Sequence, residues 1–324
     1  MKIVILDGWT VNPGDNPWDE LSRFGELVVY KRTGPGEIVE RAQDADIVLT
    51  NKTPLRADIL ASLPKLRFVA ELATGYDNVD VAFAGRLGIP VANVPEYGTV
   101  SVAQHTMALL LELCNRVGEH AAAVENGEWC QAPDFSFWRA PLVELAGKRF
   151  GIVGLGRIGQ RVAELAHAFG MEILAYNPRT RSADTSVPVL WKDIPALFAE
   201  ADVVSLHCPL TSENAQFVDS RLLGLMKETS FLINTARGKL VNEMDLAEAL
   251  NRGRIGGAAL DVVSREPIED GNPLLTARNC LITPHVAWAS IDARRRLTAA
   301  TVRNIEAFLE GKPINLVNAG FLKG

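Results

Sequence analysis

Short runs of β-branched and other apolar residues alternate with amphipathic segments along the first third of the chain. The apolar runs cover residues 2–6, 27–30, 45–50, 67–72 and 90–94. Parallel strands that are buried on both faces show such nearly continuous runs, and the helices that connect them supply the amphipathic segments. We therefore expect an α/β unit built on a parallel sheet.

A long helical pattern and an irregular segment follow this unit. Apolar residues recur at helical spacing from residue 101 to about residue 117, which predicts one buried helix. Residues 126–141 then show no clear period and carry several aromatic side chains. Exposed aromatic residues in such an arm are typical of a subunit interface.

The alternation of strands and helices restarts at residue 148. The predicted strands of this second α/β unit cover residues 149–153, 172–176, 203–206, 231–234, 258–263 and 281–283. A long helical pattern follows from about residue 289 to residue 309. If that helix packs on the first unit, the first unit is discontinuous in sequence, and the pattern alone leaves this question open.

Composition and charge restrict the classes of partner. The 324 residues are 48% hydrophobic, and their net charge of −6 offers no basic field to nucleic acid or to an anionic membrane surface. The apolar run that begins at Met1 stops at Asp7, and no apolar stretch approaches the roughly 20 residues of a membrane span. We expect a cytoplasmic protein that binds neither nucleic acid nor membrane.

The four cysteines are Cys114, Cys130, Cys208 and Cys280, and none of them stands in a CxxC pair. Their spacing disfavours both a disulfide framework and a structural zinc site. A reducing compartment and the absence of a bound metal are therefore the expectation.

A glycine-rich turn lies between a predicted strand and the helical run after it. Gly154, Gly156 and Gly159 form the pattern GxGxxG, with Arg157 and Ile158 between the last two glycines. The first glycine permits a tight turn, the second lets a pyrophosphate approach the backbone, and the third lets helix and strand pack closely. The helix N-terminus adds amide groups for the anion. This context predicts a dinucleotide site and disfavours a merely structural turn.

The residue expected to meet the adenosine ribose is not acidic. A carboxylate about 20 residues beyond the glycines normally binds the ribose 2′-hydroxyl, but Asn177 occupies this place and is followed by Arg179, Thr180 and Arg181. A neutral residue backed by arginines suits a 2′-phosphate, whereas ordinary solvated loop arginines give the same pattern. We expect NADP(H) to be favoured over NAD(H) by a small margin.

Three polar residues follow the last three predicted strands, where parallel-sheet enzymes place their chemistry: Arg237, Glu266 and His285. Reduction of a 2-keto acid needs a proton donor for the developing alkoxide, a cation for the carbonyl and carboxylate, and a group that tunes the donor. A carboxylate beside an imidazole favours its protonated form. Singly, each residue has a simpler explanation as a packing, turn or loop residue, but their succession in one dinucleotide domain favours catalysis.

At this point the residues indicate a family, because the chain resembles the D-isomer-specific 2-hydroxyacid dehydrogenases along essentially its whole length. The segments that carry the resemblance are residues 73–80 (ATGYDNVD), 93–95, 102–104, 154–159, 207–211 (HCPLT), 234–238 (NTARG), 261–267 (DVVSREP) and 284–285. The resemblance implies two Rossmann-like parallel-sheet domains, with the cofactor domain inserted into a flavodoxin-like substrate domain. The implied substrate domain covers residues 1–99 and 289–324, and the implied NAD(P)-binding domain covers residues 100–288.

The resemblance also assigns roles to single residues. It implies that His285 is the acid/base, that Glu266 is its carboxylate partner, and that Arg237 anchors the substrate carboxylate together with the backbone of Thr74 and Gly75. The further implied cofactor contacts are Val102, Cys208, Pro209, Thr235, Ala236, Asp261 and Ala287, besides Arg237 and His285. Two residues depart from the family pattern: Gln104 replaces a glutamate that many members carry, and Asn177 replaces the usual acidic residue.

Residues 51–54 (NKTP) and 284–289 (PHVAWA) resemble one branch of the family, the hydroxypyruvate and glyoxylate reductases, also called glycerate dehydrogenases. Lys52 is a candidate contact for a small polar substrate, with a solvated loop lysine as the alternative. We expect an oxidoreductase that transfers hydride between NAD(P)H and hydroxypyruvate or glyoxylate. The alternatives are a D-lactate or other D-2-hydroxyacid dehydrogenase, and a cofactor-sensing binding protein like the corepressor relatives of this family.

Members of this family are commonly dimers that are joined through an arm, which corresponds here to about residues 120–145. A homodimer is therefore implied. Trp138 lies in this arm, where it either approaches the active site of the partner subunit or anchors a hydrophobic interface.

Overall fold

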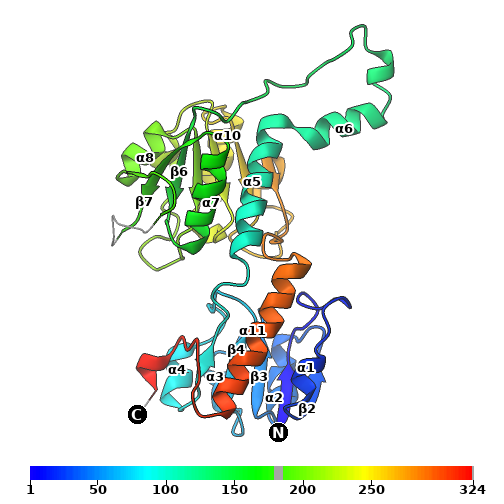
Figure 1. Cartoon of the computed structure of the whole chain (residues 1–324), viewed down its shortest axis with the longest axis vertical. Helices are drawn as coiled ribbons and strands as arrows, with labels where there is room; N and C mark the ends of the chain where they lie inside the picture. The colour runs from blue at the N-terminus through cyan, green and yellow to red at the C-terminus, as the bar shows by residue number, and fades with distance from the viewer. Residues whose placement is uncertain (179–184, 323–324) are drawn as a thin grey trace. The chain divides into compact units, whose positions relative to one another are not determined.

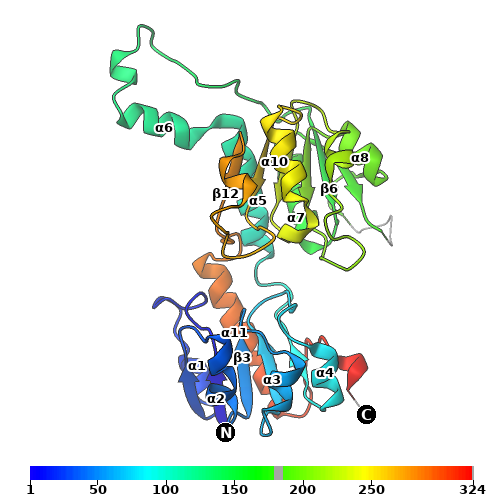
Figure 2. The same cartoon turned by 180° about the vertical axis from the view of Figure 1, so that it is seen from behind.

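The computed structural model describes residues 1–178 and 185–322, which form two compact units (Figure 1, Figure 2). One unit comprises Met1–Gly98 and Trp288–Gly324, and the other comprises Thr99–Ala287. Each unit contains one parallel sheet with helices on both faces. The predicted α/β class with two parallel sheets is therefore confirmed.

The first unit is built on a five-stranded sheet with the order β2-β1-β3-β4-β5. Its strands are β1 (Lys2–Ile5), β2 (Glu26–Val29), β3 (Ile47–Thr50), β4 (Phe68–Glu71) and β5 (Val91–Ala92). Its helices are α1 (Asp19–Ser22), α2 (Ile38–Ala42), α3 (Ala57–Ala61), α4 (Val81–Arg86) and α11 (Ile291–Leu309), and the 3-10 turns are η1 (Pro35–Glu37) and η5 (Ala319–Phe321). Successive side chains of a strand face opposite sides of the sheet. Ile3 therefore joins the core under α11, whereas Val4 joins the core under α2, α3 and α4.

The second unit is built on a seven-stranded sheet with the order β12-β11-β10-β9-β6-β7-β8. Its strands are β6 (Arg149–Val153), β7 (Glu172–Tyr176), β8 (Leu190–Trp191), β9 (Val203–Leu206), β10 (Phe231–Asn234), β11 (Gly257–Leu260) and β12 (Cys280–Ile282). Its helices are α5 (Thr99–Asn115), α6 (Val117–Glu125), α7 (Arg157–Ala168), α8 (Ile194–Glu200), α9 (Ser220–Leu223) and α10 (Glu243–Asn251). The remaining 3-10 turns are η2 (Trp129–Gln131), η3 (Gly238–Leu240) and η4 (Pro273–Thr276). Helices α5 and α7 cover one face of this sheet, and α8, α9 and α10 cover the other.

The strand order of the second sheet reverses between β6 and β9. The loops that leave these two strands touch each other, because a Cβ atom added to Gly154 would lie 2.6 Å from the backbone nitrogen of Cys208. Open parallel sheets bind their ligands at such a reversal, beyond the carboxyl ends of the strands. The topology thus places the glycine turn at the expected ligand-binding position.

An arm, residues 116–142, leaves the second unit after α5. Arg116 takes a left-handed backbone conformation with φ of +48°, which ends α5 at Asn115 and starts α6 in a new direction. The single helix predicted to about residue 117 therefore ends two residues earlier, and α6 was not predicted. The arm rejoins the unit where the backbone nitrogen of Val143 donates to the carbonyl of Cys114 at 3.1 Å.

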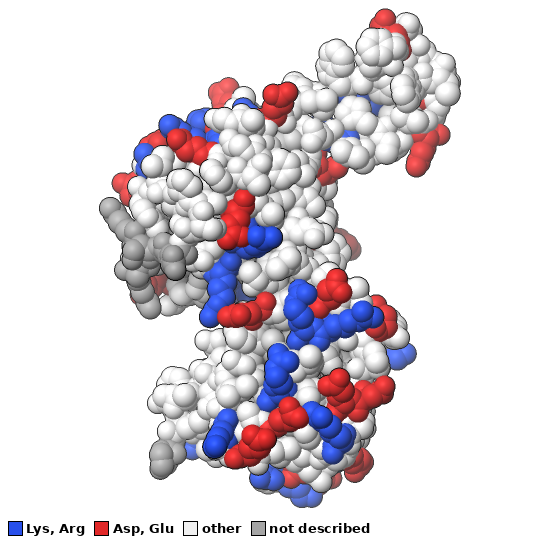
Figure 3. Space-filling model, in the orientation of Figure 1, with Lys and Arg blue, Asp and Glu red and all other residues white. Residues whose placement is uncertain are grey.

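The arm exposes large apolar side chains. Trp129 is 54% exposed, Trp138 is 68% exposed and Phe135 is 90% exposed. The space-filling view shows few charged residues on this part of the surface (Figure 3). Several exposed aromatic rings in one arm are unusual for a segment that faces water alone.

The sequence pattern differs from the structure mainly at the ends of elements. The run 90–94 predicts a longer strand than the observed β5. The strand ends early because the backbone nitrogen of Val94 donates to the carbonyl of Ala73, which lies in the loop after β4. The two-residue edge strand β8 is too short for a periodic pattern to predict. In the described part of the chain, no helix is long and apolar enough to cross a membrane.

Candidate active site

The glycine turn has the sterics of a pyrophosphate site. Gly154 has φ of +101°, and a Cβ atom on Gly159 would lie 2.3 Å from the carbonyl oxygen of Gly154, so both positions require glycine. A Cβ atom on Gly156, in contrast, would meet no described atom within 4 Å. Gly156 is the N-cap residue of α7, where backbone N–H groups and the helix dipole favour an anion. The open space at Gly156 therefore fits a bound dinucleotide.

Asn177 contacts the same turn. Its Oδ1 accepts a hydrogen bond of 2.7 Å from the backbone nitrogen of Leu155. The residue that replaces the usual carboxylate therefore stabilises the glycine turn directly. Arg179, Thr180 and Arg181, which the sequence assigns to the adenosine side of the cofactor, lie outside the described residues.

The two residues predicted to form an acid/base pair are in contact at the carboxyl edge of the second sheet. Nδ1 of His285, in the loop after β12, lies 2.7 Å from Oε2 of Glu266, in the loop after β11. Both side chains are partly exposed, at 25% and 35%. The contact leaves Nε2 as the ring nitrogen through which His285 can exchange a proton with a ligand.

The backbone around His285 is unusual and is held by Asp261. His285 has φ of +55°, a conformation that residues other than glycine rarely adopt. The carboxylate of Asp261 accepts hydrogen bonds from the next two backbone nitrogens, those of Val286 at 2.9 Å and Ala287 at 2.8 Å, and from the hydroxyl of Thr283 at 2.6 Å. Asp261 therefore fixes the loop on both sides of the imidazole.

The charge of Asp261 is stabilised although the residue is only 1% exposed. Burial alone would raise its pKa, but hydrogen bonds from His105, Thr283 and the two loop amides lower the pKa below the ordinary value. His105, on α5, has its Nε2 3.4 Å from Oδ1 of Asp261 and 3.1 Å from the hydroxyl of Thr283. From the sequence, Asp261 was predicted only as a cofactor contact, and neither this role nor that of His105 was predicted.

Arg237 follows β10, which pairs with β11, and β11 pairs with β12. Arg237, Glu266 and His285 thus follow three neighbouring strands. The turn that carries Arg237 packs closely on the loop that leads to Glu266, because a Cβ atom on Gly238 would lie 1.9 Å from the carbonyl carbon of Val263. Glu243 of α10 fixes the same loop by accepting bonds from the backbone nitrogen and hydroxyl of Ser264, at 2.6 and 2.7 Å.

Several predicted cofactor residues border this edge of the sheet. The hydroxyl of Thr235 lies 3.1 Å from that of Thr106, and the backbone nitrogen of Ala236 donates to Oδ1 of Asn234 at 3.0 Å. Val102 is buried on α5, and the carbonyl of Ala287 accepts from the hydroxyl of Ser101 at 2.7 Å.

The loop after β9 contains His207, Cys208 and Pro209. The imidazole of His207 lies 2.8 Å from the hydroxyl of Ser205, and burial lowers its pKa to about 3. Burial raises the pKa of the Cys208 thiol to about 11. Both groups are therefore uncharged at neutral pH, and these two side chains add no charge beside the glycine turn.

The predicted substrate residues of the first unit lie in loops at the carboxyl edge of its sheet. The backbone nitrogen of Lys52 donates to Oδ2 of Asp7 at 2.6 Å, and its side chain is exposed. The hydroxyl of Thr74 donates to the carbonyl of Val94 at 2.8 Å, and the carbonyl of Thr74 accepts from Nδ2 of Asn93 at 2.7 Å. These contacts leave the amide groups of Thr74 and Gly75 as the polar groups suited to a carboxylate.

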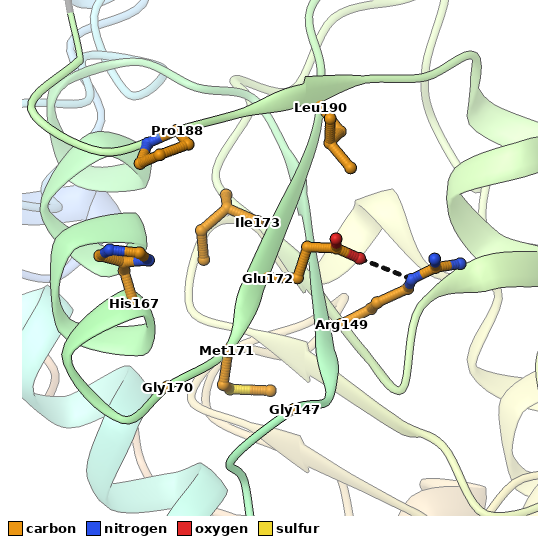
Figure 4. Close-up of a pocket in the computed structure, with 9 residues that line it drawn as sticks. All are labelled: Gly147, Arg149, His167, Gly170, Met171, Glu172, Ile173, Pro188 and Leu190. Carbon is orange, nitrogen blue, oxygen red and sulfur yellow. Dashed lines mark hydrogen bonds and ion pairs between the residues drawn. The ribbon is translucent and has the colours of Figure 1, made fainter.

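A separate pocket of about 520 Å³ lies at the opposite, amino edge of the second sheet (Figure 4). His167 of α7 lines it, and Nε of Arg149 and Oε2 of Glu172, at the first residues of β6 and β7, form an ion pair of 2.7 Å there. The pocket contains no residue that the sequence analysis selected. Within the described ranges, no group of three or more His, Cys, Asp or Glu side chains could hold a metal ion.

Comparison with known proteins identifies the class. Residues 107–287 match the model of the NAD binding domain of the D-isomer specific 2-hydroxyacid dehydrogenases. The chain therefore belongs to this family of dehydrogenases, and the resemblance drawn from the motifs is confirmed.

Individual relatives agree with this class over nearly the whole chain. The chain is 48% identical to a hydroxypyruvate reductase of Blautia hydrogenotrophica, over 98% of this chain and 100% of the relative. It is 41% identical to a glycerate dehydrogenase of Methylorubrum extorquens, over 98% and 99% of the two chains. A solved structure of an NADPH-dependent glyoxylate/hydroxypyruvate reductase from Sinorhizobium meliloti, in complex with NADP and malonate, is similar with a TM-score of 0.85 at 28% identity. That similarity covers 100% of this chain and 98% of the other.

Proposed function

We propose that this protein catalyses hydride transfer between NAD(P)H and a small 2-keto acid, reducing hydroxypyruvate or glyoxylate to D-glycerate or glycolate. The observation that carries the proposal is the 2.7 Å contact between His285 and Glu266. Both residues lie in loops at the carboxyl edge of the sheet whose strand β6 leads into the glycine turn. The 48% identity to a hydroxypyruvate reductase supports the choice of substrate.

The glycine turn of residues 154–159 would hold NAD(P)H, which when bound would supply the hydride to C2 of the keto acid or accept it from C2 of the hydroxy acid. Because Glu266 holds Nδ1 of His285, Nε2 gives the proton to the oxygen that becomes the alcohol, and takes it back in the reverse reaction. Glu266 stabilises the charged imidazole by its own negative charge. The guanidinium of Arg237 binds the substrate carboxylate and polarises the carbonyl.

The first unit supplies the remaining substrate contacts in this proposal. The amide groups of Thr74 and Gly75 bind the substrate carboxylate, and the exposed ammonium of Lys52 adds positive charge for a small polar acid. The inward bonds of the Thr74 hydroxyl and carbonyl support this assignment, because they fix the direction of the amides.

A panel of 2-keto acids tests the substrate. Glyoxylate, hydroxypyruvate, pyruvate and phosphohydroxypyruvate are each assayed with NADH and with NADPH, and we expect the highest kcat/KM for hydroxypyruvate or glyoxylate. A higher kcat/KM for pyruvate would assign the enzyme to the lactate branch. Cofactor binding without turnover of any acid would contradict an enzymatic role and favour a cofactor-sensing protein.

The cofactor in this proposal is NADP(H) by a small margin over NAD(H), because Asn177 carries no charge to repel a 2′-phosphate. Asn177→Asp tests this choice. The variant keeps the acceptor for the backbone nitrogen of Leu155 and adds only a charge, so the ratio of kcat/KM for NADPH to that for NADH should fall. An unchanged ratio would show that residue 177 does not select the cofactor.

The proposed assembly is a cytoplasmic homodimer joined through the arm. The exposed rings of Trp129, Phe135 and Trp138 support it, because exposed aromatic side chains gathered in one segment are typical of a subunit interface. Sedimentation of the wild type and of Phe135→Asp checks the proposal: we expect a dimer for the first and a larger monomer fraction for the second. A wild-type monomer at micromolar concentration would refute it.

A further inference from the structure

Glu71, the last residue of β4, is completely buried. Its Oε2 accepts a hydrogen bond of 3.1 Å from Nδ2 of Asn78. Its Oε1 is the one buried side-chain polar atom of the described residues without a hydrogen-bond partner. A buried carboxyl group with an unpartnered oxygen lowers the stability of the fold, because that oxygen loses its hydrogen bonds to water and gains none in the protein. The position therefore calls for a functional explanation.

Asn78 connects Glu71 to a second loop. The same Nδ2 atom lies 3.3 Å from the carbonyl oxygen of Thr53, and the backbone oxygen of Asn78 accepts from the nitrogen of Leu55 at 2.9 Å. Two segments are joined in this way: residues 51–55, which include Lys52, and residues 73–78, which include Thr74 and Gly75. Asp7 fixes the segment 51–55. Its carboxylate accepts hydrogen bonds of 2.6 to 2.8 Å from three successive backbone nitrogens, those of residues 51 to 53.

We propose that Glu71 is a positioning residue for substrate binding, which acts through Asn78 to hold the segment with Thr74 and Gly75 against the segment with Lys52. The inference rests on the proposed function, because it concerns the loops that bind the substrate carboxylate there. Glu71 itself lies below these loops and is not a substrate contact.

The charges around Glu71 determine the form in which it acts. The charged groups that face it are Asp7 from the loop after β1, Lys52 from the loop after β3, and Asp77 from its own loop. Burial is the largest cause that raises the pKa of Glu71 well above the ordinary value; Asp7 and Asp77 raise it further, against the bond from Asn78 and the charge of Lys52. The pKa of Glu71 is thus displaced toward the uncharged acid, and ionisation of Glu71 would place a negative charge beneath the proposed site for an anionic substrate.

Three variants of the full-length enzyme test the inference. Glu71→Ala removes the contact, and we expect the KM of the keto acid to rise about tenfold, as for the loss of one buried hydrogen bond, with kcat at saturation nearly unchanged. Glu71→Gln keeps an uncharged acceptor for Asn78 and should restore the KM at neutral pH. Asn318→Ala is the matched control, since Asn318 is 1% exposed in the same unit and bonds to other segments, at residues 81, 89 and 91.

The dependence of KM on pH separates positioning from simple stabilisation. In the wild type, KM should rise as pH increases through the raised pKa of Glu71, whereas Glu71→Gln should lack this rise and share the kcat profile of the wild type. Equal KM profiles for the two proteins would overturn the inference, and so would a KM of Glu71→Ala equal to that of the wild type. If Glu71→Ala does not fold, the comparison with Glu71→Gln decides the question.

A readout without catalysis distinguishes failure of this inference from failure of the proposed function. Hydrogen exchange of the amides at residues 73–78 should be faster in Glu71→Ala and in Asn78→Ala, and the double variant should add little, because both changes break one connection. Faster exchange in the two variants, found together with a wild type that turns over no keto acid, would support the loop contact and refute the proposed function alone. Unchanged exchange with normal wild-type turnover would refute the inference alone.

Discussion

The carboxyl edges of the two sheets both carry a buried acid, Glu71 in the first unit and Asp261 in the second, but the acids hold different kinds of group. In the second unit, Asp261 fixes the loop on either side of His285, so that the edge presents an imidazole. In the first unit, the buried Glu71 and the partly buried Asp7 fix loops whose backbone amides are the proposed substrate contacts. A ring that transfers a proton must be held in one orientation, whereas amides that bind an anion need only a fixed backbone.

This difference predicts a division of kinetic effects. Changes at the imidazole edge act on the chemical step and should lower kcat. Changes at the amide edge act on binding of the ground state and the transition state alike, and should raise KM.

The largest effect is expected from His285→Ala. Loss of the proton donor should lower kcat by about 100-fold to 10,000-fold, with the Kd of NAD(P)H nearly intact. Stopped-flow single turnover measures the first quantity, and fluorescence titration measures the second. His167→Ala is the matched control, because His167 is an exposed histidine at the amino edge of the same sheet. Wild-type turnover in His285→Ala would contradict the assigned acid/base.

A smaller loss is expected from Asp261→Asn, which removes the charge that caps the loop after β12. The backbone of His285 then loses part of its support, and kcat should fall by about tenfold to a hundredfold, since catalytic geometry tolerates little displacement. The variant should also lose about 1–3 kcal/mol of stability at neutral pH, because a buried bond to a charged group is weakened.

The pH dependence of that stability has a definite sign. The pKa of Asp261 is lowered in the folded protein from the ordinary value of 3.8, so its stabilising contribution is present above that value and is lost as pH falls through the folded pKa. Urea unfolding of the wild type and of Asp261→Asn should therefore differ at pH 7 and converge below about pH 4. A constant difference across this range would contradict the role of the charge.

These residues also show which parts of the candidate site could be predicted from the sequence. The glycine turn, Arg237, Glu266 and His285 were predictable because each follows a strand within a short motif, and because carboxyl ends of parallel strands meet at one edge. Other contacts depend on how the loops fold over the edge of each sheet. Asp261 bonds to residues 22 to 26 positions away in the second unit, and Asn78 contacts Glu71 in the first. No periodicity records such contacts. Asp7 offered a signal, as a carboxylate directly after the first strand.

Gly156→Ala tests whether a change at backbone that binds an anion also affects binding in the second unit, as it is expected to do in the first. The added methyl meets open space and a backbone conformation that alanine accepts, so stability should be unchanged. The methyl then occupies the approach of the pyrophosphate, and the Kd of NAD(P)H should rise about tenfold. Gly159→Ala is the contrasting variant: its Cβ atom would lie 2.3 Å from the carbonyl of Gly154, and its Tm should fall. Equal Tm losses in both variants would contradict an open site at Gly156.

The smallest effect, and the one that tests the amide edge most directly, is expected from Thr74→Val. The variant keeps the shape of the side chain and removes the hydroxyl that donates to the carbonyl of Val94. The amides of Thr74 and Gly75 then lose one of their anchors, while the bond from Asn93 to the carbonyl of Thr74 keeps the loop in place. The KM of the keto acid should rise about threefold to tenfold, with kcat changed by less than about twofold. Thr74→Ser keeps the hydroxyl and should restore the KM. If Thr74→Val lowered kcat and left KM unchanged, the first sheet would share in the chemical step, and the division between an edge of side chains and an edge of amides would fail.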